Sequence, residues 1–464
     1  GTSSIMIGDS TTGTIDAANY NTGLGVDVFA ALTTGDNNVA IGFAALDANT
    51  TGGSNVAIGL DALGGNTTAD SNIAIGRGAL YVNTTGADNV AIGRNALVAN
   101  TTASNNTAVG RSALGANTTG ANNVAVGSLS LDANTTGASN TAVGQGALTN
   151  STTASNNTAV GADALVANTT GERNVALGAL ALDADTTGDR SVAVGYGALS
   201  DQNFTGGEDT KNVAVGYQAL TQNTTGLSNT GLGYQSLYAN TTGTQNTAVG
   251  AAALDANTTA SYNTALGYAA LGANTGASNV AVGRYAMLTN TSGQENAALG
   301  RDALRLNTTG SENTAVGFSA LYAHTTGHYN SALGKNALGS STTASYNTAI
   351  GNNAGSAVTT GASNVCIGYD AGNAITTGDN NVIIGYGSDV SAVDGDGANV
   401  LGRNVSGAAG YTTLGSGSDD IRAAHGNVTW ATVSDERVKK DIEDSTAGLS
   451  FINDLRPRTF NYRN

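Results

Sequence analysis

The stretch NVAIGRNALVANTTASN occupies residues 89–105, and the next seventeen residues, 106–122, are NTAVGRSALGANTTGAN. The two match position by position, with Asn, Ala, Gly, Leu and Thr recurring at the same places. Repeats of fixed period usually form arrays in which each copy is one unit that neighbouring copies stabilise. The sequence therefore predicts an elongated repeat protein.

The repeat holds its register along most of the chain. The glycine that ends each A-[VIL]-G triplet occurs 24 times from Gly8 to Gly402, and 21 of the 23 spacings are 17 residues. The exceptions are a four-residue insertion within residues 201–211 and a one-residue deletion near Asn274. The consensus is N-[VT]-A-[VIL]-G-x-x-A-L-x-x-N-T-T-G-x-x, in which the first Asn is position one and the marker glycine is position five.

Each unit predicts one coil of an all-β, repetitive parallel β-solenoid of about 24 coils. Positions one to five resemble a short strand rich in Val, Ile and Thr, and NTTG resembles a turn. Ala96 and Leu97 predict a second short strand in the same coil. The alternative is a short helix at RNALVA (94–99), as in leucine-rich repeats, but those units usually run about 20–29 residues.

Stacked coils rise about 4.8 Å each, so 24 of them predict a rod roughly 110 Å long. Identical residues then form ladders, in which Asn hydrogen-bonds along the axis and Leu fills a narrow core. Near the end Gly355 and Gly372 replace the Leu, while Val358 and Ile375 appear nearby. This change indicates a compensating change of coil shape.

Strand alternation places Asn, Ala and Gly on one face and the β-branched residues on the other. A single thin chain would leave one of these faces exposed. We expect an elongated homotrimer, in which the small Asn-Ala-Gly face permits close approach of the subunits, although periodicity alone does not give the number three.

Composition excludes several classes of partner. The net charge of −16 argues against nucleic acid and an anionic membrane surface. No apolar run reaches 18 residues, so no membrane insertion is expected, and GTSSIMIGDS shows no signal peptide. The single cysteine, Cys366, takes an Ala position and is interpreted as a small apolar filler. No cofactor is expected.

The composition changes at the C-terminus. From Asp435 onward 12 of 30 residues are charged, against 40 of the preceding 434. Ser434 is suited to cap a short helix. We therefore predict a shaft at residues 1–402, a transition segment at 403–433 and a separate, partly α-helical module at 434–464.

That module, SDERVKKDI…GLSFINDLRPRTFNY, resembles the start of the endosialidase-type intramolecular chaperone domain, also classed as peptidase family S74. The resemblance implies a phage tail fibre or tailspike whose chaperone assembles a homotrimer and then cuts itself off. By position it implies cleavage between Ser434 and Asp435, with Ser434 as nucleophile and Lys439 as general base. Only the start of that domain is matched, so we expect a truncated module. No other enzymatic activity is expected.

The NxAIGxxAL units resemble head repeats of trimeric autotransporter adhesins of the YadA and haemagglutinin type. That resemblance implies a left-handed parallel β-roll in a trimer, with a somewhat shorter repeat.

Two small motifs contain residues that can bind metal ions. His324 and His328 flank one turn, and we interpret them as an Asn-to-His exchange at a surface turn. The DGDG at Asp394–Gly397 lacks the later acidic ligands of an EF-hand and is interpreted as a turn. We therefore expect no metal site.

Position six, the residue after the marker glycine, is the most variable position, and the same residue type recurs there in successive coils. Three stacked arginines would repel one another if buried, so this column is expected to face solvent. Exposed tyrosines are suited to stack on sugars. The candidate surface-contact column consists of Arg77, Arg94 and Arg111, then Tyr196, Tyr217 and Tyr234, with Tyr369 and Tyr386 later.

The sequence thus predicts a structural, fibrous virion protein that forms a rigid trimeric shaft for host attachment, with a host polysaccharide or receptor as partner and a virion or extracellular location. The alternative is a bacterial trimeric surface adhesin or extracellular filament. A catalytic tailspike would need a cleft with paired carboxylates, and the uniform coil offers none.

Overall fold

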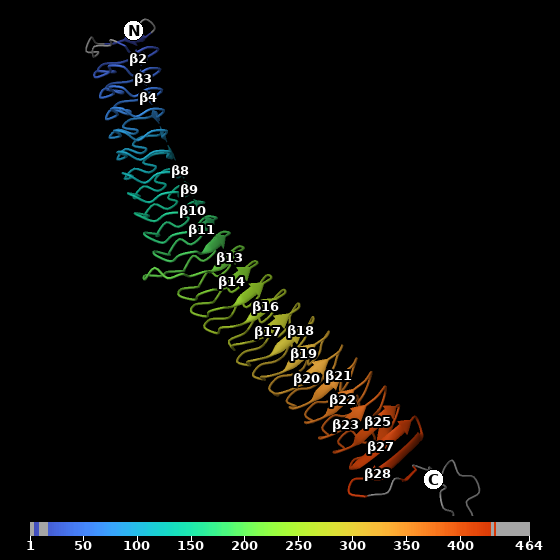
Figure 1. Cartoon of the computed structure of the whole chain (residues 1–464). Coiled ribbons are helices and arrows are strands. Elements are labelled where there is room, and N and C mark those ends of the chain that lie inside the picture. The colour runs from blue at the N-terminus through green and yellow to red at the C-terminus, as the bar shows by residue number, and fades with distance from the viewer. Residues whose placement is uncertain (1–3, 9–16, 428–430, 433–464) are drawn as a thin grey trace, which may run out of the picture.

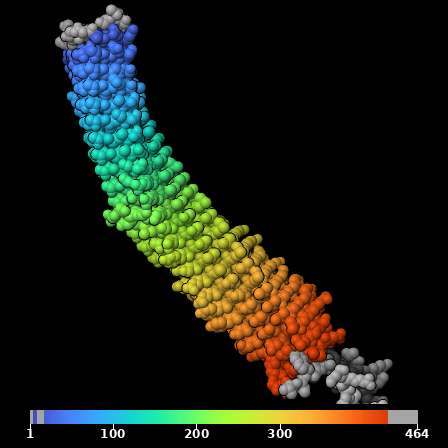
Figure 2. All heavy atoms as spheres, in the orientation of Figure 1, coloured from blue at the N-terminus to red at the C-terminus, as the bar shows by residue number. Residues whose placement is uncertain are grey.

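A computed structural model describes residues 4–8, 17–427 and 431–432 of the chain. Figure 1 shows a long, curved rod in which one short strand per coil lies along one side. The heavy atoms form a continuous rod without a waist (Figure 2). The predicted solenoid of 24 coils is confirmed, because β1–β23 each end directly before a marker glycine and β25 contains the last one, Gly402. No helix occurs in the described ranges.

The strands have the following bounds: β1 (Ile5–Ile7), β2 (Thr22–Leu24), β3 (Val39–Ile41), β4 (Val56–Ile58), β5 (Ile73–Ile75), β6 (Val90–Ile92), β7 (Thr107–Val109), β8 (Val124–Val126), β9 (Thr141–Val143), β10 (Thr158–Val160), β11 (Val175–Leu177), β12 (Val192–Val194), β13 (Val213–Val215), β14 (Thr230–Leu232), β15 (Thr247–Val249), β16 (Thr264–Leu266), β17 (Val280–Val282), β18 (Ala297–Leu299), β19 (Thr314–Val316), β20 (Ser331–Leu333), β21 (Thr348–Ile350), β22 (Val365–Ile367), β23 (Val382–Ile384), β24 (Asp389–Val390), β25 (Asn399–Arg403), β26 (Ser406–Gly407), β27 (Tyr411–Ser416), β28 (Asp419–Ala424) and β29 (Ala431–Thr432).

The coil strands form one parallel sheet with every repeat position in register. Ala91 of β6, for example, pairs with Ala108 of β7. At the C-terminal end β27 pairs in parallel with β25 and in antiparallel with β28. The segment predicted as a transition therefore continues the sheet beyond the last marker glycine and folds back as a hairpin.

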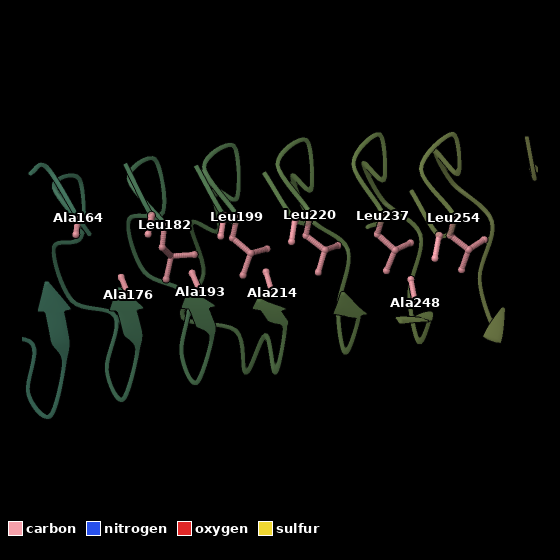
Figure 3. Packing of buried hydrophobic residues seen from close by; sticks show 14 of the residues in the cluster. Ala164, Ala176, Leu182, Ala193, Leu199, Ala214, Leu220, Leu237, Ala248 and Leu254 are labelled. Atoms are coloured by element: carbon pink, nitrogen blue, oxygen red, sulfur yellow. The ribbon is translucent and has the colours of Figure 1, made fainter. Parts of the chain in front are cut away.

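The core lies between the strands and the segment that carries Ala and Leu at positions eight and nine. The strand alanine is fully buried in nearly every coil, and Ala193 faces Leu199 across the core in Figure 3. The small face of the strand is thus the interior of the coil. The prediction that this face contacts other subunits is wrong, because the leucine column of the same chain already covers it.

The second strand predicted at Ala96 and Leu97 is also absent. Positions six to eleven form a chain of turns in which Asn95 and Leu97 adopt positive φ, 58° and 50°. Neighbouring residues in a strand point to opposite faces, whereas Ala96 and Leu97 are both buried. The segment still joins the next coil, since the Leu97 N–H donates to the Ala113 carbonyl at 3.0 Å.

Two asparagine ladders run inside the rod, as predicted. At position one, Asn89 Oδ1 accepts the Asn106 N–H at 3.0 Å, and Asn89 Nδ2 donates to the Ala103 carbonyl at 2.9 Å. At position twelve, Asn100 Nδ2 donates to Asn83 Oδ1 at 2.8 Å. A buried amide without a hydrogen-bond partner lowers the stability of the fold. These ladders therefore hold each coil to its neighbours at two places, positions one and twelve.

The insertion replaces one step of these ladders. Gln202 takes position twelve and donates to Asp185 at 2.7 Å and to Ser191 at 3.0 Å, while its carbonyl accepts from Asn212 at 2.8 Å. The exposed residues 205–208 belong to the loop that projects from the green part of the rod in Figure 1. The stacking of coils continues across it, with β12 paired to β13.

Near the C-terminal end the exchange of residues moves apolar volume from position nine to position twelve, while the backbone at position nine keeps its conformation. The predicted change of coil shape is not seen in these dihedral angles. Val358 and Ile375 are fully buried at position twelve, and Gly355 and Gly372 keep the positive φ of the leucines that they replace. Cys366 is 1% exposed, and burial raises the pKa of its thiol to about 12. It is therefore an inert filler, as predicted.

The marker glycine is sterically required. Gly267 has φ 136°, and a Cβ added to it would lie 2.6 Å from the Gly283 carbonyl oxygen of the next coil. In the same coil, Gly272 has an ordinary φ, and an added Cβ would first meet the flexible Leu288 side chain at 3.1 Å.

We predict that Gly267→Ala lowers the free energy of unfolding by about 2–4 kcal/mol, through backbone strain and the clash with the next coil. Gly272→Ala should change it by less than about 1 kcal/mol. Thermal unfolding and hydrogen exchange of the adjacent coils provide the measurement. Equal losses in the two variants would contradict the steric assignment.

Candidate functional site: the surfaces of the rod

Position six presents tyrosines to solvent. Tyr196, Tyr217 and Tyr234 are 48%, 46% and 54% exposed. Their ring centroids are 5.6 and 5.5 Å apart, with interplanar angles of 14° and 7°. Because the coils are in register, successive rings stack in parallel and form a flat aromatic column.

The arginines of the same column, Arg77, Arg94 and Arg111, are exposed as well. Water screens their mutual repulsion there. The Nε of Arg111 also donates to the Ser128 hydroxyl of the next coil at 3.4 Å. What this column contacts remains a prediction.

The outward face of the strands carries an apolar stripe, which we define as the first and third residues of β1–β23 and β25. The third residue is Val, Ile or Leu in all of these strands. The first residue is never charged; it is Thr, Ser or Asn in eleven of the 24 strands and apolar in the other thirteen. Exposure reaches about half at Leu299, Leu333 and Leu401. Within the described chain, the apolar stripe thus runs from β1 to β25.

His324 is buried, which corrects its predicted place at a surface turn. It takes position twelve, and its ring nitrogens lie 2.8 Å from the Gly327 carbonyl and 3.2 Å from the Ser341 hydroxyl. His328 is exposed, and its Nδ1 accepts the Ser311 N–H at 3.0 Å. The two imidazoles therefore do not form a joint site.

The other metal candidate, Asp394–Gly397, lies in an exposed loop. Asp396 accepts the Asp379 N–H of the preceding coil at 2.7 Å. The described ranges contain no group of three or more His, Cys, Asp or Glu residues placed to hold a metal ion. Nor do they contain a helix with the length and hydrophobicity to cross a bilayer.

A groove of about 530 Å³ opens on positions seven, ten and eleven of three successive coils. Its wall includes Tyr322 and the side chains of Asn336 and Asn353. The groove exists because position ten, which holds Tyr322 in one coil, holds Gly339 and then Ser356 in the next two.

A smaller groove of about 290 Å³ repeats this arrangement near the N-terminal end. Gly64 at position ten separates Asp47 from Tyr81, and Asp61 adds a second carboxyl. Burial raises the pKa of Asp47, against hydrogen bonds from backbone N–H groups that lower it.

Ser434 and Lys439, the predicted cleavage residues, lie outside the described residues, as does the predicted C-terminal helix. Residues 434–464 match the family model described as the chaperone of endosialidase, Peptidase_S74. No curated protein and no solved structure matches the chain. The family match covers the C-terminal segment alone and does not extend to the rod.

The two grooves could not be predicted from the sequence. The signal was present in position ten, where small residues interrupt a column of larger ones. It could not be interpreted without knowing that position ten points outward, beside the buried Leu of position nine.

We predict that His324→Asn, which restores the residue typical of position twelve, stabilises the rod more at pH 5 than at pH 7.5. Burial lowers the pKa of His324 below the ordinary 6.5. The unfolded chain therefore takes up a proton more readily than the folded one, and stability falls as the pH drops below about 6.5. Thermal unfolding of both proteins at the two pH values measures this, and an equal difference at both would contradict it.

Proposed function

We propose that the chain forms the rigid shaft of a fibrous virion appendage, similar to a phage tail fibre, and that three copies associate along their apolar stripes. The observation that carries the proposal is the uncharged stripe along 24 coils. The match of residues 434–464 to the chaperone of endosialidase supports the virion setting and the number three.

The size of the apolar stripe is adequate for stable association. At about 4.8 Å per coil and about 3.3 Å per strand residue, it measures roughly 110 by 10 Å. That corresponds to about 1,100 Å² per chain, above the roughly 800 Å² per partner of a standard protein interface. Copies arranged around a common axis would cover it, whereas a monomer would leave it in water.

The C-terminal match supports a maturation step. We propose that the complete chaperone assembles the trimer and is then released by cleavage between Ser434 and Asp435. In this proposal Lys439 accepts the proton of the Ser434 hydroxyl, and the oxygen attacks the carbonyl carbon of the Ser434–Asp435 peptide bond. The C–N bond breaks as Lys439 returns the proton to the Asp435 nitrogen, and water then hydrolyses the ester that has formed.

The location follows from the same proposal: part of a virion, exposed outside the cell. The alternative, a bacterial trimeric adhesin or extracellular filament, would use the same rod, and the C-terminal match favours the virion. The exposed column of Tyr196, Tyr217 and Tyr234 supports contact with a host polysaccharide or receptor, since the edges and hydroxyl groups of its stacked rings are available to sugar hydroxyl groups.

We predict a native mass three times that of the single chain in the same sample, which is 45.6 kDa for the uncut 464 residues and less after cleavage at Ser434. Introducing Glu at the third residue of three successive strands, as Ile92→Glu, Val109→Glu and Val126→Glu, should shift the protein to monomer, because three chains would bring nine carboxylates together in an apolar interface. Mass photometry measures the change.

The matched control introduces the same charge at position ten, on the other side of the coil, as Val98→Glu, Thr149→Glu and Val166→Glu. This variant should remain trimeric. A monomeric parent protein, or equal dissociation in both variants, would overturn the proposed interface.

We further predict that protein expressed from the complete coding sequence ends at Ser434, and that Ser434→Ala leaves it uncut. Lys439→Arg should slow cleavage at least about tenfold, since Arg cannot act as a base at neutral pH. Intact-mass spectrometry over time gives the result. A new terminus elsewhere, or cleavage that persists in Ser434→Ala, would contradict the assignment.

A further inference from the structure

We infer that the groove from Ser319 to Ala357 binds a neutral oligosaccharide. This inference rests on the proposed attachment function and places one contact with the host surface on a different part of the rod from the tyrosine column. The volume of about 530 Å³ is in the range of small-molecule sites.

The first wall is an aromatic ring with one open face. Arg305 lies over the Tyr322 ring, with its guanidinium carbon 5.8 Å from the ring centroid. On the next coil the same position is Gly339, which has no side chain to cover the ring from that side. A flat, half-buried tyrosine with one uncovered face is suited to stack on a sugar ring, which has an apolar face of similar size.

The second wall is a row of side-chain amides at position seven. Asn336 Nδ2 donates to Asn353 Oδ1 at 3.2 Å, and Asn353 Nδ2 donates to Asp370 Oδ1 at 2.9 Å. Each amide nitrogen carries two hydrogens, and the row uses one of them. The second hydrogens, together with the Ser319 and Ser356 hydroxyls, can bond to the hydroxyl groups of a sugar.

The charge of the site selects a neutral ligand. The eight lining residues include no acidic or basic side chain. Arg305, behind the tyrosine, bonds to Asp302 at 3.2 Å. The whole chain carries a net charge of −16, which repels acidic polysaccharides over the Debye length.

The groove remains accessible in the proposed assembly. Figure 3 shows the strands on one side of the core and the leucine-bearing segments on the other. Tyr322 and Gly339 directly follow buried leucines of that second segment. Subunits that meet through the strand stripe would thus leave the groove facing solvent.

The test measures binding of three neutral hexasaccharides, maltohexaose, cellohexaose and N-acetylchitohexaose, by saturation-transfer NMR and titration. At least one should bind with a Kd of about 10 mM or tighter. Gly339→Val, which places at position ten the residue found there at Val98 and Val166, should weaken binding at least about tenfold by filling the groove. Tyr322→Ala should do the same by removing the stacking face.

Gly272→Val is the matched control, because it makes the same change at the same repeat position beside Leu288 and Asp255 instead of a tyrosine, and it should bind like the parent. Failure of all three sugars to bind, undiminished binding by Gly339→Val, or tighter binding of hexagalacturonate would overturn the inference. The native mass of the same sample separates the two proposals. A trimer that binds none of the sugars overturns the groove alone, and a monomer that binds overturns the trimer alone.

Discussion

The contact between each marker glycine and the carbonyl of the next coil constrains the whole rod. Gly267 approaches Gly283 so closely that an added Cβ would lie within 2.6 Å of its oxygen. With φ near 136° at this position, only glycine turns the chain from the strand into the leucine-bearing segment without strain. Every coil therefore begins its second half at the same place, and the 17-residue register follows from that.

Because the register is fixed, each position becomes a column with one environment. A buried leucine at position nine adopts a left-handed backbone that costs roughly 1–2 kcal/mol. Burial of its side chain contributes roughly 1.5–3 kcal/mol in return. At Gly355 and Gly372 the glycine removes this backbone strain, but it also removes the buried leucine side chain. Val358 and Ile375 at position twelve supply the missing apolar volume.

The sequence was sufficient for the period, the number of coils and the asparagine ladders, because these depend on spacing and hydrogen-bonding capacity. It was misleading about which face of the strand is the interior and which faces outward. Ala91 looks too small to form a core, yet Leu97 reaches across to fill the space that it leaves. The larger Val90 and Ile92 then point outward, where neighbouring copies rather than the same chain would have to cover them. His324 was misplaced for a related reason, since a residue beside a turn motif can still point into the coil.

The interior columns stabilise the rod, whereas the surface columns differ from one part of the rod to another. Interior positions one, three, five, nine and twelve have partners in both neighbouring coils, so a change at any of them alters two interfaces. The side chains at positions six and ten lie on the surface, where they contact the same position of the next coil, as in the stacked Tyr196 and Tyr217, without entering the core. They can therefore vary without changing the interior. A single small residue at position ten, such as Gly339, therefore opens a groove without disturbing the ladders beneath it. A repeated coil can thus acquire local binding sites through surface substitutions alone, while its length and stiffness remain unchanged.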